Sequence, residues 1–297
     1  MKDLLRFSRH LWQFSRPHTI VGTSLSLVAI WLITGDFYST YRLTTLAIAL
    51  LVCIGGNIYI VGLNQIFDLE IDRINKPQLP LAAADLSLRQ AWLIILISGF
   101  SAVILSLTQG IFLWLTVSFS LVIGTLYSVP PLRWKRSPWL ASACILAVRG
   151  LIVNLGIFLH FQADLGHSPQ VIPVIWLLTS FVLVFSYAIA ICKDLPDMDG
   201  DAQFQILTLS LLWGKKLVLT LTKSLLLSLY LIMVVVLWHL NFTLLSIAHG
   251  AISLILLWRC DRVDLNHQPS ITQFYQFIWK LFFLEYIIFP LTCLLQP

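Results

Sequence analysis

The chain has 297 residues, of which 58% are hydrophobic and 11% are charged, and its formal net charge is +5. Soluble domains carry about 25% charged residues, so this composition excludes an ordinary water-soluble fold and indicates a protein that crosses a membrane several times. The five cysteines stand singly, without the spacing of a metal site, and are expected to be small apolar side chains.

Nine apolar segments are long enough, or nearly so, to cross a bilayer, which takes a helix of about 20 residues. They lie at about 18–35, 44–65, 90–108, 111–128, 139–161, 170–192, 215–237, 241–258 and 276–295. A short basic amphipathic segment, residues 1–17, precedes them and is predicted to lie on the membrane surface. We therefore expect an all-α membrane protein, with a single domain over residues 1–297 built as a bundle of nine transmembrane helices.

The positive charges follow the alternation of the predicted loops. Lysine and arginine collect in cytoplasmic loops, and 16 of the 19 lie in the N-terminal segment or around the loops after every second helix. They are Lys2, Arg6, Arg9, Arg16, Arg73, Lys76, Arg89, Arg133, Lys135, Arg136, Lys193, Lys215, Lys216, Arg259, Arg262 and Lys280. This pattern predicts a cytoplasmic N-terminus, and nine helices then place the C-terminus on the opposite side.

Two acidic clusters stand at the cytoplasmic ends of the second and sixth predicted helices. In the first, Asn64, Asp68 and Asp72 are spaced four residues apart and so share one face of a helix, whereas Glu70 points away from it. The second cluster consists of Asp194, Asp197 and Asp201. We expect the two clusters to form one site.

Carboxylate and amide oxygens are the ligands that magnesium prefers, usually one or two carboxylates together with phosphate oxygens. The clusters therefore predict a magnesium site and a phosphorylated or diphosphorylated substrate. The basic residues predicted to hold the phosphate oxygens are Arg73, Lys76, Arg133, Lys135 and Lys193. The alternative is that such residues are solvated loop charges that merely follow the charge rule.

The position of the site, at the mouth of a helix bundle, favours a substrate with an apolar tail such as an isoprenoid diphosphate. Ionising an allylic diphosphate requires magnesium at the departing diphosphate, and aromatic side chains shield the resulting cation. The aromatic candidates are Tyr59, Phe67, Tyr127 and Phe158, each of which ordinary packing would also explain.

These motifs resemble the UbiA-type intramembrane aromatic prenyltransferases, and within them the branch that prenylates homogentisate, the phytyl-transferring members above all. The strings that carry the resemblance are NQIFDLEIDRINKP at 64–77, YSVPPLRWKR at 127–136, VRGLIVNLG at 148–156 and KDLPD at 193–197. Gln65 stands where many members of the wider family carry an acid, and this glutamine is similar to the homogentisate branch.

The resemblance implies a magnesium-dependent transfer of a prenyl group, most of all phytyl, from its diphosphate to homogentisate with loss of carbon dioxide, in tocopherol synthesis. It implies two magnesium sites, one on Asn64, Asp68 and Asp72 and one on Asp194, Asp197 and Asp201, and a diphosphate site on Tyr127, Arg133 and Lys135. Of these residues Asp68, Asp72, Asp194, Asp197 and Lys135 are the expected catalytic residues.

Arg149 and Asn154 are polar residues inside the fifth predicted helix. An ionisable group inside a membrane is a functional candidate by default, so we expect Arg149 to receive the carboxylate of an aromatic acid and Asn154 to contact substrate as well. Hydrogen bonding between helices is the competing interpretation of both residues.

Alternatives of two kinds stay open at this point. Within the same enzyme family, the pattern also fits a solanesyl-type donor or a hydroxybenzoate-like acceptor. A cation-coupled transporter is the alternative of another class, but transporters place ionisable groups near the middle of the membrane, whereas these acids lie at one side. The expected partners are an isoprenoid diphosphate, an aromatic acid and the lipid bilayer, without nucleic acid; no oligomeric state is predicted.

Overall fold

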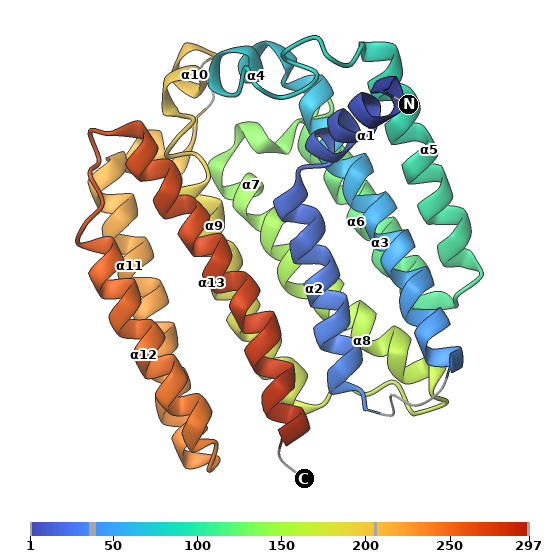
Figure 1. The fold of residues 1–297 in the computed structure, drawn as a ribbon, viewed down its shortest axis with the longest axis vertical. Helices are drawn as coiled ribbons and strands as arrows, with labels where there is room; N and C mark the ends of the chain where they lie inside the picture. The colour runs from blue at the N-terminus through green and yellow to red at the C-terminus, as the bar shows by residue number, and fades with distance from the viewer. Residues whose placement is uncertain (1, 36–39, 205–206, 296–297) are drawn as a thin grey trace.

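The computed structural model describes residues 2–35, 40–204 and 207–295, and these ranges contain helices, turns and loops but no β-strand. Eight of the described helical segments are long and apolar enough to cross a membrane. The shorter apolar helix α2 (Pro17–Ile33) runs alongside them, so that each of the nine predicted segments is a helix of the bundle (Figure 1).

The described helices are, in order, α1 (Lys2–Phe14), α2, α3 (Thr40–Phe67), α4 (Leu69–Asn75), α5 (Leu88–Leu107), α6 (Ile111–Ser128), the short η1 (Trp134–Arg136), α7 (Pro138–Ile145), η2 (Leu146–Ile152), α8 (Val153–Asp164), α9 (Pro173–Cys192), α10 (Met198–Gln203), α11 (Leu209–His239), α12 (Thr243–Cys260) and α13 (Gln268–Leu295). The segments α7, η2 and α8 form one continuous span, and η2 is its π-helical middle.

Small residues allow α3 to approach its neighbours closely. A Cβ atom added to Gly62 would lie 2.4 Å from Ile95 of α5, and one added to Gly99 would lie 2.5 Å from Tyr59 of α3. Because lipid tails are as apolar as side chains, close packing of small residues is one of the forces that associate membrane helices. The close contact with α5 therefore fixes the position of α3, the helix whose end carries the first acidic cluster.

The core of the other half surrounds α9. Phe181 and Phe185 of this helix stack with a centroid separation of 5.0 Å, and both meet Tyr230 of α11 edge-on. Helix α13 packs against both α9 and α2, and α2 packs against α3, which joins the two halves. Large apolar residues cover the outer surface, among them Phe100, which is 72% exposed, and Leu244, which is 79% exposed. Such a surface suits lipid.

Both acidic clusters lie at the same end of the bundle. Helices α4 and α10 contact each other there, near the N-terminal end of the described chain, while α13 ends at the opposite end (Figure 1). Residues more than a hundred positions apart in the sequence are thereby brought to one rim.

Candidate active site

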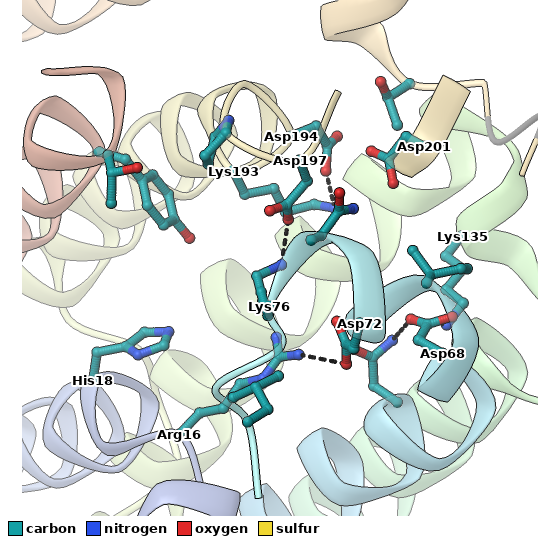
Figure 2. Close-up of a pocket in the computed structure, with 18 of the residues that line it drawn as sticks. Arg16, His18, Asp68, Asp72, Lys76, Lys135, Lys193, Asp194, Asp197 and Asp201 are labelled. Atoms are coloured by element: carbon teal, nitrogen blue, oxygen red, sulfur yellow. Dashed lines mark hydrogen bonds and ion pairs between the residues drawn. The ribbon is translucent and has the colours of Figure 1, made fainter. Parts of the chain in front are cut away.

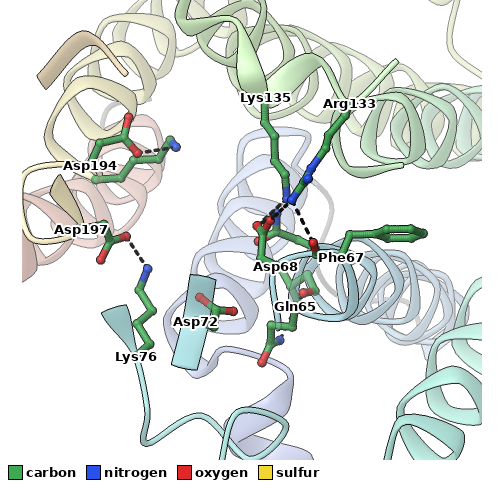
Figure 3. A network of polar contacts seen from close by, with 12 residues as sticks. Gln65, Phe67, Asp68, Asp72, Lys76, Arg133, Lys135, Asp194 and Asp197 are labelled. Carbon is green, nitrogen blue, oxygen red and sulfur yellow. Dashed lines mark hydrogen bonds and ion pairs between the residues drawn. The ribbon is translucent and has the colours of Figure 1, made fainter. Parts of the chain in front are cut away.

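The first cluster begins where α3 ends. Asp68 stands between α3 and α4, and its carboxylate accepts a hydrogen bond of 3.0 Å from the Asn64 side chain. Arg133 donates to the same carboxylate at 2.8 Å and to the Phe67 carbonyl at 2.9 Å. The ammonium group of Lys135 forms a further ion pair with Asp68 (Figure 3). One carboxylate is therefore held by two cations from the loop after α6.

Three of the other aspartates, Asp72, Asp194 and Asp197, are also paired with cations. Asp72 is buried and lies 3.8 Å from the guanidinium of Arg16. A salt bridge joins Lys76, at the end of α4, to Asp197 of the second cluster. Because this pair crosses from one cluster to the other, it shows directly that the two predicted clusters face each other. Within the second cluster, Lys193 pairs with Asp194 at 2.7 Å.

A cavity of about 680 Å³ opens between these groups, and we call it the outer cavity (Figure 2). Its polar lining includes Arg16, Asn64, Asp68, Asp72, Lys76, Lys135, Lys193, Asp194, Asp197 and Asp201. All six residues predicted as metal ligands therefore line the same cavity, as do Tyr127 and the lysines of four different segments.

The charges shift the protonation equilibria of the groups at the rim. Burial raises the pKa of Asp68, but Lys135 and Arg133 outweigh it and hold the pKa below its usual value. Burial lowers the pKa of Lys135 to about 8, although Asp68 opposes the change. The pKa of Asp72 is raised, chiefly by burial. Burial, followed by the charges of Asp194 and Asp197, raises the pKa of Asp201 to about 7. Burial therefore disfavours the charged form of both Asp72 and Asp201.

Magnesium fits this set of donors. Among the described residues, no group of three acidic, histidine or cysteine side chains is arranged to hold a metal ion. The acids lie around the cavity, and several of them are paired with cations. However, one carboxylate oxygen of Asp72, Oδ2, is buried without a hydrogen-bond partner, and the lining supplies the hard oxygen atoms that magnesium prefers. Asn64, Asp68 and Asp72 on one side and Asp194, Asp197 and Asp201 on the other are the residues that would hold it.

A second cavity, of about 260 Å³, continues from the first into the helix bundle, and we call it the inner cavity. The two cavities share Arg16, His18, Asn64, Tyr127, Lys193, Tyr275 and Trp279 in their walls. Arg149 lines the inner cavity, and its guanidinium lies 4.6 Å from the ring centroid of Trp279.

Three of the predicted substrate contacts, Arg73, Arg133 and Asn154, line neither cavity. Arg133 still reaches the rim through its bond to Asp68. Arg73 pairs with Glu70 at 2.7 Å, and the two side chains are 52% and 64% exposed, so the turn of α4 directs Arg73 to solvent rather than to the site. Asn154 is fully buried and bonds to the backbone of its own helix and to Tyr286. It therefore acts between helices and does not reach either cavity.

Of the four aromatic candidates, Tyr127 lines the cavities. The Tyr59 hydroxyl instead contacts Thr125 at 3.0 Å, and Phe67 packs edge-on against Trp92. Phe158 is fully buried in the core. Ordinary packing accounts for these three.

Sequence reasoning assigned no role to one complete wall of the outer cavity, which belongs to α13. Its lining residues are Gln268, Thr272, Tyr275, Gln276, Trp279, Lys280 and Phe283. A signal was present, because Gln268, Thr272, Gln276 and Lys280 recur every four residues and so mark one polar face of an otherwise apolar helix. His18 of α2 was also missed; its ring lies 5.0 Å from that of Trp279, edge to face.

Gln65 also gains a physical explanation. Its amide donates to the Phe14 carbonyl at 2.7 Å and to the Val61 carbonyl at 3.2 Å, and the residue is 1% exposed. The side chain thus joins the end of α1 to α3 beside the first cluster and serves the fold rather than the metal.

A membrane bundle with carboxylates and cations around one cavity at its rim defines a class of enzyme that handles diphosphates. Residues 23–281 match the UbiA prenyltransferase family, and the chain belongs to that family. It is 50% identical to the homogentisate phytyltransferase of Synechocystis sp. over 94% of each chain. It is 39% identical to the homogentisate geranylgeranyltransferase of Triticum aestivum, over 95% of this chain and 72% of that protein.

A UbiA homologue from Archaeoglobus fulgidus bound to GPP and Mg2+ has the same fold. The TM-score is 0.65, the match covers 94% of this chain and 99% of that one, and the sequence identity is 18%. At that identity the likeness concerns the fold. The predicted all-α bundle is therefore the fold that the two chains share.

Proposed function

We propose that this chain transfers a prenyl group, phytyl in the first instance, from its diphosphate to homogentisate, with loss of carbon dioxide, as a step of tocopherol synthesis. The observation that carries the proposal is the outer cavity, where carboxylates of two distant segments and the cations Lys76, Lys135 and Lys193 surround a space that continues into the inner cavity. The names of the relatives at 50% and 39% identity support the choice of acceptor.

The ion pairs of the outer cavity suit an exchange of partners on substrate binding. Lys76 pairs with Asp197, and Lys135 and Arg133 pair with Asp68. Diphosphate oxygens can take the place of these carboxylates at the cations, which frees the carboxylates for magnesium. Because each leaving partner is replaced by one of the same sign, the buried charge stays balanced throughout.

The bond between C1 of the prenyl group and the diphosphate oxygen breaks, and its electron pair leaves with the diphosphate. A ring carbon of the acceptor bonds to C1, and the ring loses a proton. The carboxylate leaves as carbon dioxide, and the benzylic carbon keeps the electron pair and takes up one proton. Magnesium, when bound, supplies electrostatic stabilisation of the departing diphosphate.

The two predicted metal sites and the cytoplasmic location of the cavity are part of the proposal. Each acidic cluster offers enough oxygen ligands for one magnesium ion: Asn64, Asp68 and Asp72 on one side, Asp194, Asp197 and Asp201 on the other. The rim that carries them also carries most of the lysine and arginine of the predicted loops, and the positive charge favours the cytoplasmic side.

The test is incubation of membranes that contain the protein with labelled homogentisate and a panel of prenyl diphosphates of different length, with and without magnesium. We expect a prenylated, decarboxylated product of phytyl mass that requires magnesium. Geranylgeranyl diphosphate, which has the same chain length as the phytyl donor but more double bonds, and the longer solanesyl diphosphate identify the alternative specificities. Labelled hydroxybenzoate tests the alternative acceptor. If no aromatic acceptor is prenylated with any donor, the proposal is wrong.

A further inference from the structure

We propose that the inner cavity is the binding site of the aromatic acid and that Arg149 is the residue that binds its carboxylate. The proposal rests on the proposed function, since it assigns the acceptor half of that reaction to a place in the bundle. It also decides between the two interpretations of Arg149 that the sequence left open.

The charge of the inner cavity is the first argument. Three cations line it, Arg16, Lys193 and Arg149, but none of its lining residues is an acid. Arg16 and Lys193 stand at the boundary and pair with acids of the outer cavity, at 3.8 and 2.7 Å. Among the described residues, Arg149 makes neither a salt bridge nor a side-chain hydrogen bond. A cation buried in a membrane span without a counterion is costly, and an anionic ligand supplies the missing partner.

The aromatic walls are the second argument. The Arg149 guanidinium lies 4.6 Å from the ring centroid of Trp279 and 5.9 Å from that of Phe282, both on α13. Stacking of this kind stabilises the cation and fixes the plane of the guanidinium, while the donor nitrogens at its edge stay available for a carboxylate. Tyr275 and Tyr286 complete the aromatic lining. An anion attached to an aromatic ring matches both the charge and the walls.

The local backbone is the third argument. Arg149 lies in η2, the π-helical part of its span, where the regular hydrogen-bond ladder is interrupted. π-Helical turns occur frequently at functional sites. Asn154 compensates here: its amide donates to the carbonyls of Arg149, at 3.0 Å, and Gly150, at 2.8 Å, and its own oxygen accepts from the Tyr286 hydroxyl at 3.1 Å. Asn154 is therefore a positioning residue, which holds the turn that presents Arg149.

The location relative to the outer cavity is the fourth argument. Tyr127, Lys193 and Trp279 belong to the walls of both cavities. An acceptor bound in the inner cavity through Arg149 would therefore present its ring toward the end of the cavity where the diphosphate departs. In the outer cavity five aspartates and five cations line the same space, so a carboxylate would compete there with the acids of the chain, whereas no acid lines the inner cavity.

The test compares Arg149→Met with the wild-type protein on two acceptors: homogentisate, and the same hydroquinone with a methyl group in place of the carboxymethyl group. For homogentisate we expect KM to rise about 10- to 100-fold, the effect of losing a charge-assisted hydrogen bond. We expect KM for the prenyl diphosphate, and the use of the neutral hydroquinone, to stay within about twofold, because the outer cavity is unchanged. Lys135→Met is the matched control and should raise KM for the diphosphate instead.

Three further measurements separate binding from folding. Binding of labelled homogentisate without donor or magnesium should weaken by the same factor in Arg149→Met. The melting temperature of this variant should stay equal or rise, because an unpaired charge leaves the membrane interior. Asn154→Leu should raise KM for homogentisate by a smaller factor and leave KM for the diphosphate unchanged.

The outcomes are distinguishable. If the wild type prenylates homogentisate and Arg149→Met binds it equally well, the acceptor assignment is overturned while the proposed function stands. A lower melting temperature with unchanged KM would make Arg149 a structural residue. A wild-type protein that neither binds nor prenylates any aromatic acid contradicts the proposed function itself, and the acceptor assignment with it.

Discussion

The outer and inner cavities share a wall but differ in how their charges are arranged. In the outer cavity acids and bases are paired, as in Lys76 with Asp197 and Lys193 with Asp194. In the inner cavity Arg149 faces aromatic rings, with no acid among the lining residues. The outer cavity is suited to exchange both members of each pair for metal and diphosphate, whereas the inner cavity is suited to accept a single anion.

The two cavities thus represent two kinds of charged site in one apolar protein: a site of ion pairs and a site with an unpaired cation. Paired charges at the rim keep the unliganded protein stable and give way to ligands of matching sign. The unpaired charge of Arg149, deeper in the bundle, is stabilised by the ring faces of Trp279 and Phe282, which partly replace water. Removing each kind of charge, or the metal, should therefore affect the two cavities differently.

Removing magnesium with EDTA should abolish prenyl transfer while leaving the inner cavity functional. Without metal, the carboxylates of Asp68 and Asp197 keep the cations that the diphosphate needs, and the departing diphosphate is not stabilised. Product formation is measured with and without EDTA, and binding of labelled homogentisate is measured in the same samples. Transfer at the original rate in EDTA, or a loss of acceptor binding together with transfer, would contradict the division. Restoring magnesium is the control.

Asp68→Asn should lower kcat by about 10²- to 10³-fold, comparable to the loss of one group that stabilises the transition state. The substitution keeps the shape but removes the charge that Arg133 and Lys135 hold in place. Turnover of labelled prenyl diphosphate at saturating magnesium is the measurement. Glu70→Gln is the matched control on the exposed side of the same segment and should stay at the wild-type rate. Equal losses in both variants would show that the whole segment, not its cavity face, sets the rate.

Lys135→Met should raise KM for the prenyl diphosphate about 10- to 100-fold, corresponding to a charge-assisted hydrogen bond of about 1.5–3 kcal/mol. Lys135 is buried beside Asp68, whereas its neighbour Arg136 is exposed. Steady-state kinetics of Lys135→Met and Arg136→Met compare the two. If KM for the diphosphate is the same in both variants, Lys135 and Arg136 are loop charges that follow the charge rule for cytoplasmic loops.

Arg73→Gln should change both KM values and the melting temperature very little. An exposed ion pair contributes about 0–1 kcal/mol, and Arg73 is bound to Glu70 outside the cavities. Kinetics with both substrates and thermal unfolding in detergent are the measurements. A rise in KM for the diphosphate would return Arg73 to the phosphate site, and would show that α4 turns when substrate binds.

Much of the architecture could be predicted because it depends on local patterns. Every predicted apolar segment became a helix, and the spacing of Asn64, Asp68 and Asp72 correctly placed all three on the cavity side. The aspartates of the second cluster were equally visible as a concentration of charge beside an apolar segment. Membrane helices are easily recognised, since every backbone polar group must be bonded within the helix.

Other features depend on contacts between distant segments and could not be predicted from local sequence patterns. Arg73 and Lys76 look equivalent in the sequence, but one pairs with Glu70 in solvent and the other with Asp197 across the cavity. Gln65 matched the family pattern, but its role followed only from the structure, in which its amide donates to the carbonyl of Phe14.

Hydrophobicity and helical spacing are properties of each segment alone, and for this reason they predicted a membrane protein, its helical segments and the acidic composition of the site. The tertiary structure decided which charges meet, that α13 forms a wall of the cavity, and that Arg149 faces Trp279 without an acid among the described residues near it. The physical reason is that a charge acquires its role from its neighbours, and in a bundle those neighbours come from helices far away in the chain.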